Sequence, residues 1–218
     1  MKNHPSSLPC SLAACVLIFA GSSLAFAEPS IKGVPKGVPN FHVVDDQVLR
    51  GGQPTGVGFR NLAAMGVRTI VDLQEDGDRS RDEKKLVKAL GMKYVNIPMK
   101  GMTTPTEKQI SHALKALNDN SDGPVFVHCK RGADRTGVVI ACYRIKHDHW
   151  DNPKALSEAR NYGMSWYQLP LQRYVRSYEP HDSGLDAPGV AGAIRDKTVE
   201  LAEKVSHGVT GILDSVRK

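Results

Sequence analysis

"PVFVHCKRGADRTGVVIACY", residues 124–143, joins two apolar runs through a polar loop. Residues 125–127 are β-branched or aromatic and predict a buried strand, whereas residues 138–143 predict a buried helix. The loop between them, residues 128–137, contains one cysteine, three cations, one carboxylate and two glycines. Since ligands of α/β proteins bind where parallel strands end, this loop is the first candidate for a functional site.

Strand and helix patterns alternate along the rest of the chain. Strands are expected at residues 41–44, 47–50, 67–74 and 93–99, and helices at 55–66, 78–90, 104–118, 152–161 and 167–178. Gly66 and Gly91 are expected to end two helices, and Thr104 or Thr106 with Glu107 resembles a capping box. The pattern predicts an α/β fold with a central, mainly parallel sheet flanked by helices.

The two ends of the sequence differ from its middle. Residues 1–27 contain one charged residue, Lys2, and a short apolar core before small residues, which is typical of a cleaved signal peptide. This core is too short to span a bilayer, so we expect export to the periplasm or secretion, with a lipoprotein site at Cys15 as the alternative. The expected organisation is a signal peptide at 1–27, an extended lead-in at 28–40, a globular domain at 41–180, a linker at 181–190 and an amphipathic helical tail at 191–218.

Composition narrows the kinds of partner. The net charge of +6 favours anionic ligands. The sequence has no stripe of Lys/Arg interleaved with aromatic residues and no zinc-finger spacing, so a nucleic-acid partner is not expected. After the signal peptide only Cys129 and Cys142 remain, too few for a disulfide scaffold. Cys142 is expected to be buried in an apolar helix, whereas Cys129 has polar and cationic neighbours that make a thiol reactive.

The loop residues together suggest a chemistry. Gly132 and Gly137 let the backbone curl, so that N–H groups and the helix N-terminus form a cradle for an anion. Arg135 adds a planar fork suited to phosphate oxygens. The same positive field favours the thiolate of Cys129, a nucleophile directed at phosphorus. We expect phosphate ester hydrolysis through a phosphocysteine intermediate, with no metal and no cofactor.

The motif Cys129-x5-Arg135, followed by Thr136 and Gly137 and preceded by His128, closely resembles the signature of cysteine-based protein tyrosine and dual-specificity phosphatases. Further stretches are similar to the small dual-specificity branch, which includes exported bacterial members: "LRGGQPT" at 49–55, "GVRTIVDLQ" at 66–74 and "YVNIPM" at 94–99. The resemblance covers roughly residues 41–178. It implies that residues 41–180 form a phosphatase domain.

The resemblance implies a role for each loop residue. Cys129 would be the nucleophile, Arg135 would bind phosphate in the ground and transition states, and the Thr136 hydroxyl would help the thiolate to leave. His128 would shape the loop from behind, although a purely structural role for His128 and Thr136 stays open. The phosphate-binding loop would comprise Lys130, Arg131, Gly132, Ala133, Asp134 and Arg135.

The sequence departs from the family where the general acid is expected. The family usually places an aspartate in the loop after the preceding strand, but residues 100–105 here contain no carboxylate. Asp134 is the leading candidate, because "DRT" also occurs in bacterial relatives and in myotubularin-like lipid phosphatases, where the loop aspartate is proposed as the acid. A capping or ion-pairing role for Asp134 is the alternative. Three further aspartates are the remaining candidates for the general acid: Asp72, Asp76 and Asp78.

Several substrates and rival functions stay open. Phosphotyrosine proteins, with phosphoserine or phosphothreonine as further targets, are the main expectation. Lys130, Arg131 and Lys100 supply more charge than one phosphate needs, which favours phosphoinositides or inositol phosphates as the alternative.

Trp166 and Tyr167 are expected in the core, with a place in the pocket wall as the other choice. The rivals are a phosphate-binding module without turnover and a rhodanese-like sulfurtransferase; the oligomeric state is not predicted.

Overall fold

The computed structural model describes residues 33–180. The expected signal peptide at 1–27, linker at 181–190 and helical tail at 191–218 lie outside these residues and stay predictions. None of the helices within 33–180 combines the length and the apolar character needed to cross a bilayer.

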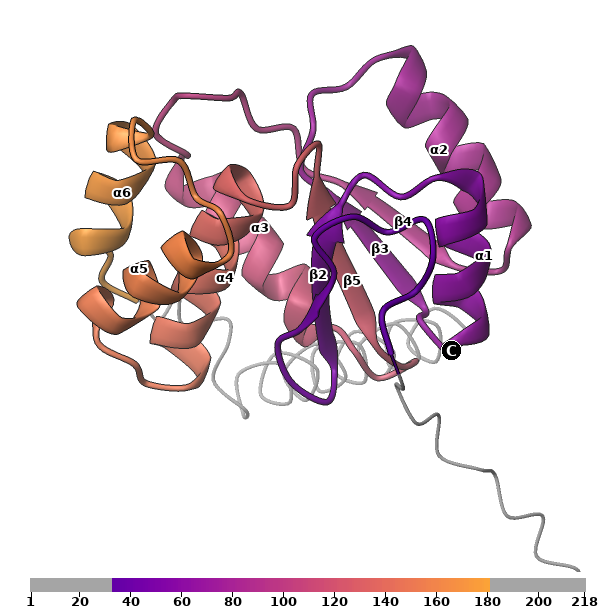
Figure 1. The fold of residues 1–218 in the computed structure, drawn as a ribbon, viewed down its shortest axis with the longest axis horizontal. Coiled ribbons are helices and arrows are strands. Elements are labelled where there is room, and N and C mark those ends of the chain that lie inside the picture. Colours follow the sequence, from indigo (N-terminus) through magenta and orange to yellow (C-terminus); the bar gives the residue numbers. More distant parts are fainter. Residues whose placement is uncertain (1–32, 181–218) are drawn as a thin grey trace, which may run out of the picture. The chain divides into compact units, whose positions relative to one another are not determined.

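A five-stranded sheet forms the centre of the fold (Figure 1). Its strand order is β1-β2-β5-β3-β4, and only β1 runs antiparallel to its neighbour. The strands are β1 (His42–Val43), β2 (Val48–Gly52), β3 (Thr69–Asp72), β4 (Lys93–Asn96) and β5 (Val125–Cys129). The predicted α/β fold with a mainly parallel sheet is confirmed.

Helices cover both faces of this sheet. In Figure 1, α1 and α2 lie on one side and α3 to α6 on the other. The helices are α1 (Gly56–Ala64), α2 (Asp78–Ala89), α3 (Glu107–Asn118), α4 (Asp134–His147), α5 (Asn152–Asn161) and α6 (Leu169–Arg176). Both faces are therefore buried, which explains why the parallel strands are apolar runs without regular alternation.

Strand β5 supplies residues to both faces of the sheet. It is buried along its whole length between β2 and β3. Because side chains alternate along a strand, Val127 and Cys129 belong to the core beneath α3 to α6. Phe126 belongs to the core beneath α1 and α2, and it stacks on His128 with ring centroids 5.7 Å apart. Adjacent residues of the motif, His128 and Cys129, thus serve opposite sides of the sheet.

The expected helix ends are mostly confirmed. Gly66 and Gly91 have φ of 89° and 77° and follow the C-caps of α1 and α2. The capping box at α3 is formed by Thr106 with Gln109 rather than with Glu107, because the partner must stand three residues after the N-cap.

Three expectations on element ends were wrong. Strand β4 ends at Asn96 rather than continuing to residue 99, since Pro98 lacks the N–H that a ladder needs. Helix α4 begins at Asp134, so the last four residues of the expected loop at 128–137 are helical. Residues 33–40 form turns instead of an extended lead-in, and the carbonyl of Pro39 accepts from the Gly52 N–H at 2.7 Å.

Gly132 should tolerate no side chain, because its φ is +71° and a Cβ would lie inside van der Waals contact of the Gly51 and Gly52 backbone. We expect Gly132→Ala to lower the free energy of unfolding by about 3 kcal/mol or more. Gly91→Ala is the matched control: its φ is +77°, but nothing lies within 4 Å of the added Cβ. It should cost only about 1 kcal/mol of left-handed strain. Urea unfolding of both variants measures the difference; equal losses would contradict the proposed contact with β2.

Candidate active site

Cys129 lies at the point where β5 ends and is only 2% exposed. The loop of residues 130–133 follows, and α4 begins at Asp134. The first bond of the helix joins the Gly137 N–H to the Ala133 carbonyl at 2.7 Å. The first N–H groups of a helix have no partner within it, so free donors and the positive end of α4 lie beside the cysteine loop. An anion cradle requires such donors, and anion binding by this loop stays a prediction.

Arg135 extends to the ends of the two neighbouring strands. Its Nη1 donates to the carbonyls of Met99, at 3.1 Å, and Leu73, at 3.4 Å. These bonds fix the guanidinium at the carboxyl edge of the sheet. Its Nε and Nη2 make no hydrogen bond to the described residues, so two parallel donors stay free for an anion.

Thr136 stands in the first turn of α4 and is completely buried. Its Oγ1 has no hydrogen-bond partner among residues 33–180. A buried hydroxyl is costly to leave unpaired, so this oxygen is available to a thiolate or a ligand oxygen.

Two residues outside the motif hold the loop in place. Arg50, on β2, is 0% exposed, and its Nη2 donates to the Gly132 carbonyl at 2.9 Å. Asn40 Nδ2 lies 3.0 Å from the same oxygen and 3.1 Å from the Tyr162 carbonyl. Neither residue was singled out from the sequence, although "LRGGQPT" contains Arg50. The signal that would have found it is a charged residue inside an otherwise apolar strand.

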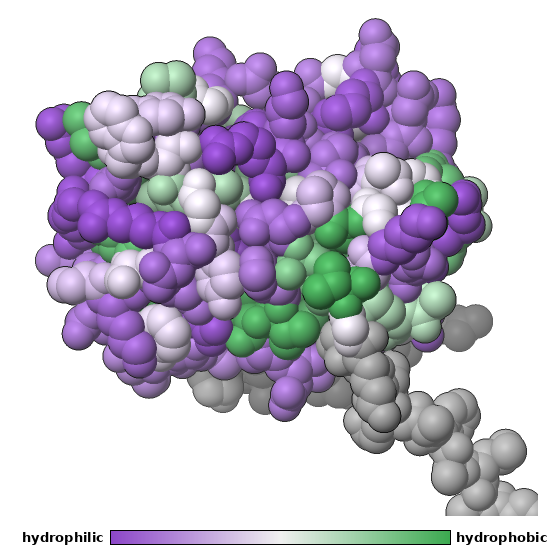
Figure 2. Space-filling model, in the orientation of Figure 1, coloured by the Kyte–Doolittle hydropathy of each residue, from purple (hydrophilic) through white to green (hydrophobic). Residues whose placement is uncertain are grey.

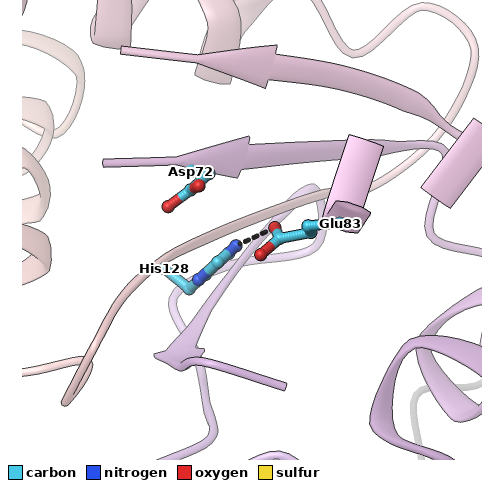
Figure 3. Close-up of side chains that lie close together, drawn as sticks. All are labelled: Asp72, Glu83 and His128. Atoms are coloured by element: carbon cyan, nitrogen blue, oxygen red, sulfur yellow. Dashed lines mark hydrogen bonds and ion pairs between the residues drawn. The ribbon is translucent and has the colours of Figure 1, made fainter. Parts of the chain in front are cut away.

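His128 is anchored to α2 by a buried ionic network (Figure 3). Its Nε2 lies 2.9 Å from Glu83 Oε1, and both side chains are buried. Since a carboxylate only accepts, Nε2 carries the hydrogen. Arg79 bridges the second Glu83 oxygen, at 2.8 Å, and Asp72, at 2.7 Å. Tyr94 donates its hydroxyl to Asp72 at 2.8 Å, and burial together with this carboxylate raises the pKa of Tyr94.

The same three side chains have donor atoms within 4.8 Å of one another: Asp72, Glu83 and His128. Such a set resembles a metal site by residue type. Arg79, however, already places its cation between the two carboxylates, and a metal ion would have to displace it. The cluster is therefore better explained as a charge-paired support for the cysteine loop.

Asp134 accepts two hydrogen bonds. The Ser165 N–H donates to its Oδ1 at 2.8 Å, and Arg131 Nη1 donates to its Oδ2 at 3.2 Å. The contact with Arg131 is an ion pair, as in the alternative role, and the other bond joins the start of α4 to Ser165. The role of Asp134 as general acid stays a prediction.

The other three candidates for the general acid, Asp72, Asp76 and Asp78, are poorly placed to deliver a proton. Asp72 is buried in the network with Arg79 and Tyr94. Asp78 is exposed and pairs with Arg81. Hydrogen bonds from Ser80 and the Gly77 N–H hold the pKa of exposed Asp76 below its ordinary value, which opposes protonation near neutral pH.

The rim of the site is cationic and aromatic. Lys100, Lys130 and Arg131 are exposed as expected. The expectation that Trp166 and Tyr167 belong to the core was wrong, since they are 83% and 46% exposed. They follow Ser165, whose hydroxyl accepts from Arg131 at 3.0 Å, so the exposed pair stands next to the cysteine loop.

A groove of about 1010 Å³ lies elsewhere on residues 33–180. It is lined by parts of α3, the end of α4, and the end of α6. None of the motif residues from His128 to Thr136 lines it, so this groove is separate from the cysteine loop.

A buried cysteine at a strand end, a curled loop and an arginine beside a helix N-terminus define a cysteine-dependent phosphatase. The sequence comparison gives the family. Residues 35–177 match the family described as "DSP-PTPase phosphatase fused to NAD+ Kinase". The chain belongs to this family of dual-specificity and tyrosine-type phosphatases, which confirms the resemblance seen in the motif.

Curated relatives include two inositol diphosphatases of Arabidopsis thaliana. The chain is 31% identical to DSP5 over 146 residues, covering 65% of this chain and 70% of that protein. It is 33% identical to DSP3 over 145 residues, with 64% and 70% covered. The sulfurtransferase alternative has no support from these relatives.

Solved structures share the fold. The core catalytic domain of the PP-IP phosphatase SIW14 from S. cerevisiae has a TM-score of 0.61 at 21% identity, over 74% of this chain and 96% of that one. TpbA from P. aeruginosa has a TM-score of 0.57 at 24% identity, over 68% and 89%. At these identities the likeness concerns the fold alone.

Loss of the Glu83 carboxylate should destabilise the protein strongly. Glu83→Ala leaves the buried His128 N–H without an acceptor and removes one of the two carboxylates that pair with Arg79, so we expect about 3 kcal/mol less free energy of unfolding. Asp82→Ala is the matched control on the same helix, because Asp82 forms only an exposed pair with Lys85 and should matter little. Urea unfolding measures both, and a loss no larger than that of the control would remove the network as a support.

Proposed function

We propose that this protein removes phosphate groups from inositol phosphates or phosphoinositides through a phosphocysteine intermediate. The names of the curated relatives support such substrates over phosphotyrosine proteins, the main expectation from the sequence. The exposed cations Lys100, Lys130 and Arg131 suit a ligand with several phosphates. The observation that carries the proposal is the absence of a carboxylate from residues 100–105.

In the first step, Cys129 Sγ attacks phosphorus while the bond from phosphorus to the leaving oxygen breaks. The electron pair of that bond stays on the leaving oxygen. Arg135 contacts the phosphoryl oxygens through Nε and Nη2, which are free in this structure. The N–H groups at the start of α4 stabilise the same oxygens.

The leaving group explains how this step proceeds without the usual acid. An alkoxide leaves only when it receives a proton, so an alkyl phosphate needs a general acid. In a diphosphate the leaving group is itself a phosphate, with a second pKa of about 6, and it departs unprotonated at neutral pH. Residues 100–105, which lack a carboxylate, are therefore compatible with cleavage of a phosphoanhydride. The relatives named inositol diphosphatases support the same bond.

In the second step, water attacks the phosphocysteine, and the bond between sulfur and phosphorus breaks. The thiolate of Cys129 is regenerated and inorganic phosphate is released. The Thr136 hydroxyl, buried and without a partner among residues 33–180, donates to the departing sulfur. No step in this sequence calls for a metal or cofactor.

Turnover should vanish in Cys129→Ser and should depend on the substrate. We expect phosphate release to be fastest from a diphosphoinositol phosphate, slower from a short-chain phosphoinositide and slowest from a phosphotyrosine peptide, all measured with the full chain. A peptide hydrolysed more than about tenfold faster than both inositol substrates would reassign the protein to phosphotyrosine. Bound phosphate with no turnover of any substrate would indicate a binding module.

Asp134→Asn tests the remaining acid. We expect turnover of the diphosphate to be nearly unchanged and turnover of an alkyl phosphate to fall by about 100-fold, since only the alkoxide needs a proton. Asp82→Asn removes an exposed carboxylate of α2 and should change neither rate. An equal loss on both substrates would show instead that Asp134 acts by holding Arg131 and Ser165.

A further inference from the structure

Arg50 is a buried cation with very few partners. Its side chain is 0% exposed, and one nitrogen donates to the Gly132 carbonyl. Its Nε and Nη1 have no hydrogen-bond partner among residues 33–180. Burial lowers the pKa of Arg50 to about 10, which still leaves it charged at neutral pH. A buried charge is expensive unless an opposite charge lies nearby, so the identity of its counter-ion matters.

The carboxylate near Arg50 already serves another cation. Glu158, on α5, accepts from Arg144 through both oxygens, at 3.0 and 3.4 Å. Tyr162 offers only its ring, whose centroid lies 4.7 Å from the Arg50 guanidinium carbon. A ring face attracts a cation but carries no net charge. The other ionisable side chain on the adjoining strand that faces the same core is Cys129.

The sheet places Arg50 and Cys129 on the same side. In the parallel register Arg50 pairs with Val127, and Gly52 pairs with Cys129. Arg50 therefore points to the face that holds Val127 and Cys129. Two residues along neighbouring strands correspond to about 8 Å between Cα atoms, so the long Arg50 side chain passes under the loop that Cys129 begins.

We propose that Arg50 is the buried cation that balances the Cys129 thiolate from beneath the loop. It is a positioning residue that also supplies charge, and it does not touch the substrate. Lys130, Arg131 and Arg135 belong to the loop itself. Lys130 and Arg131 are exposed, so solvent screens their charges. A buried charge is screened much less. This proposal concerns the nucleophile and is independent of which phosphate ester is hydrolysed.

The surroundings of both groups contain other charges. His42 on β1 lies near Arg50, and burial together with Arg50 lowers its pKa. The positive charge of Arg144, on α4, disfavours the charged form of Arg50, whereas the carboxylate of Glu158 favours it. Beside Cys129, Asp134 is neutralised by Arg131. None of these groups except Arg50 is both fully buried and short of a charged partner within the described residues.

Two substitutions separate charge from anchoring. Arg50→Gln removes the charge but keeps an N–H that reaches toward the Gly132 carbonyl. Asn40→Ala is the matched control: it removes a neutral donor to the same carbonyl, at 3.0 Å, and leaves the charge. The readout is the alkylation rate of Cys129 by iodoacetate against pH in the full chain. Mass spectrometry of the peptide that ends at Lys130 separates Cys129 from Cys142 and from the cysteines before residue 28.

We expect alkylation of Cys129 at neutral pH to slow about tenfold in Arg50→Gln, with its half-maximal pH moved upward by about one unit. Asn40→Ala should leave that midpoint in place. Equal shifts in both variants would mean that Arg50 only anchors the loop, and no shift in either would remove Arg50 from the chemistry. Both results would overturn the proposal without bearing on the substrate.

A second measurement applies if Arg50→Gln does not fold. Cys129→Ser removes the thiolate and leaves the Arg50 charge without its counter-ion. The stability advantage of the natural protein over Cys129→Ser should therefore grow as pH rises toward about 8.5, where free thiols ionise in the unfolded chain. Urea unfolding at several pH values measures this difference. A difference that does not change with pH would overturn the proposal.

Discussion

The contact between the cysteine loop and β2 is the constraint on which the site depends. Gly132 turns back with a positive φ and packs directly on the backbone of Gly51 and Gly52, where no Cβ would fit. Arg50 and Asn40 both donate hydrogen bonds to the Gly132 carbonyl. Because the loop is fixed at its centre, its two ends can present Cys129 and the start of α4 to the same anion. A stretch about 80 positions earlier in the chain thus forms the floor of the catalytic loop.

Much of this arrangement could be predicted from the sequence, because it depends on local rules. Apolar runs and glycine stops gave the order of strands and helices, and the spacing from Cys129 to Arg135 gave the loop. The position of Cys129 between a strand and a helix N-terminus could be predicted because these elements are adjacent in the sequence. Periodicity also placed Cys142 correctly as a buried helical residue.

The residues that support the loop could not be predicted, since they depend on contacts between distant segments. Glu83 lies on the charged helix α2, and its buried carboxylate is bonded to His128, Arg79 and the Gln53 amide. Arg50 stands out as a charged residue inside an apolar strand, but its contact with the Gly132 carbonyl depends on the register of β2 against β5, which no local pattern reveals. Conversely, Trp166 and Tyr167 were expected inside because aromatic residues usually are, but they are exposed beside Ser165, which bonds to Arg131 of the loop.

The position of Cys142 has a consequence for oxidation chemistry. A cysteine sulfenic acid is protected when a neighbouring thiol captures it as a disulfide, which requires Cα atoms within about 7 Å. Cys142 stands eight residues after Asp134 in α4, a rise of about 12 Å along the helix, and it is completely buried. Burial also raises the pKa of its thiol, so it stays protonated and unreactive. Within residues 33–180 an oxidised Cys129 has no resolving partner, and its recovery depends on a thiol supplied from outside this domain.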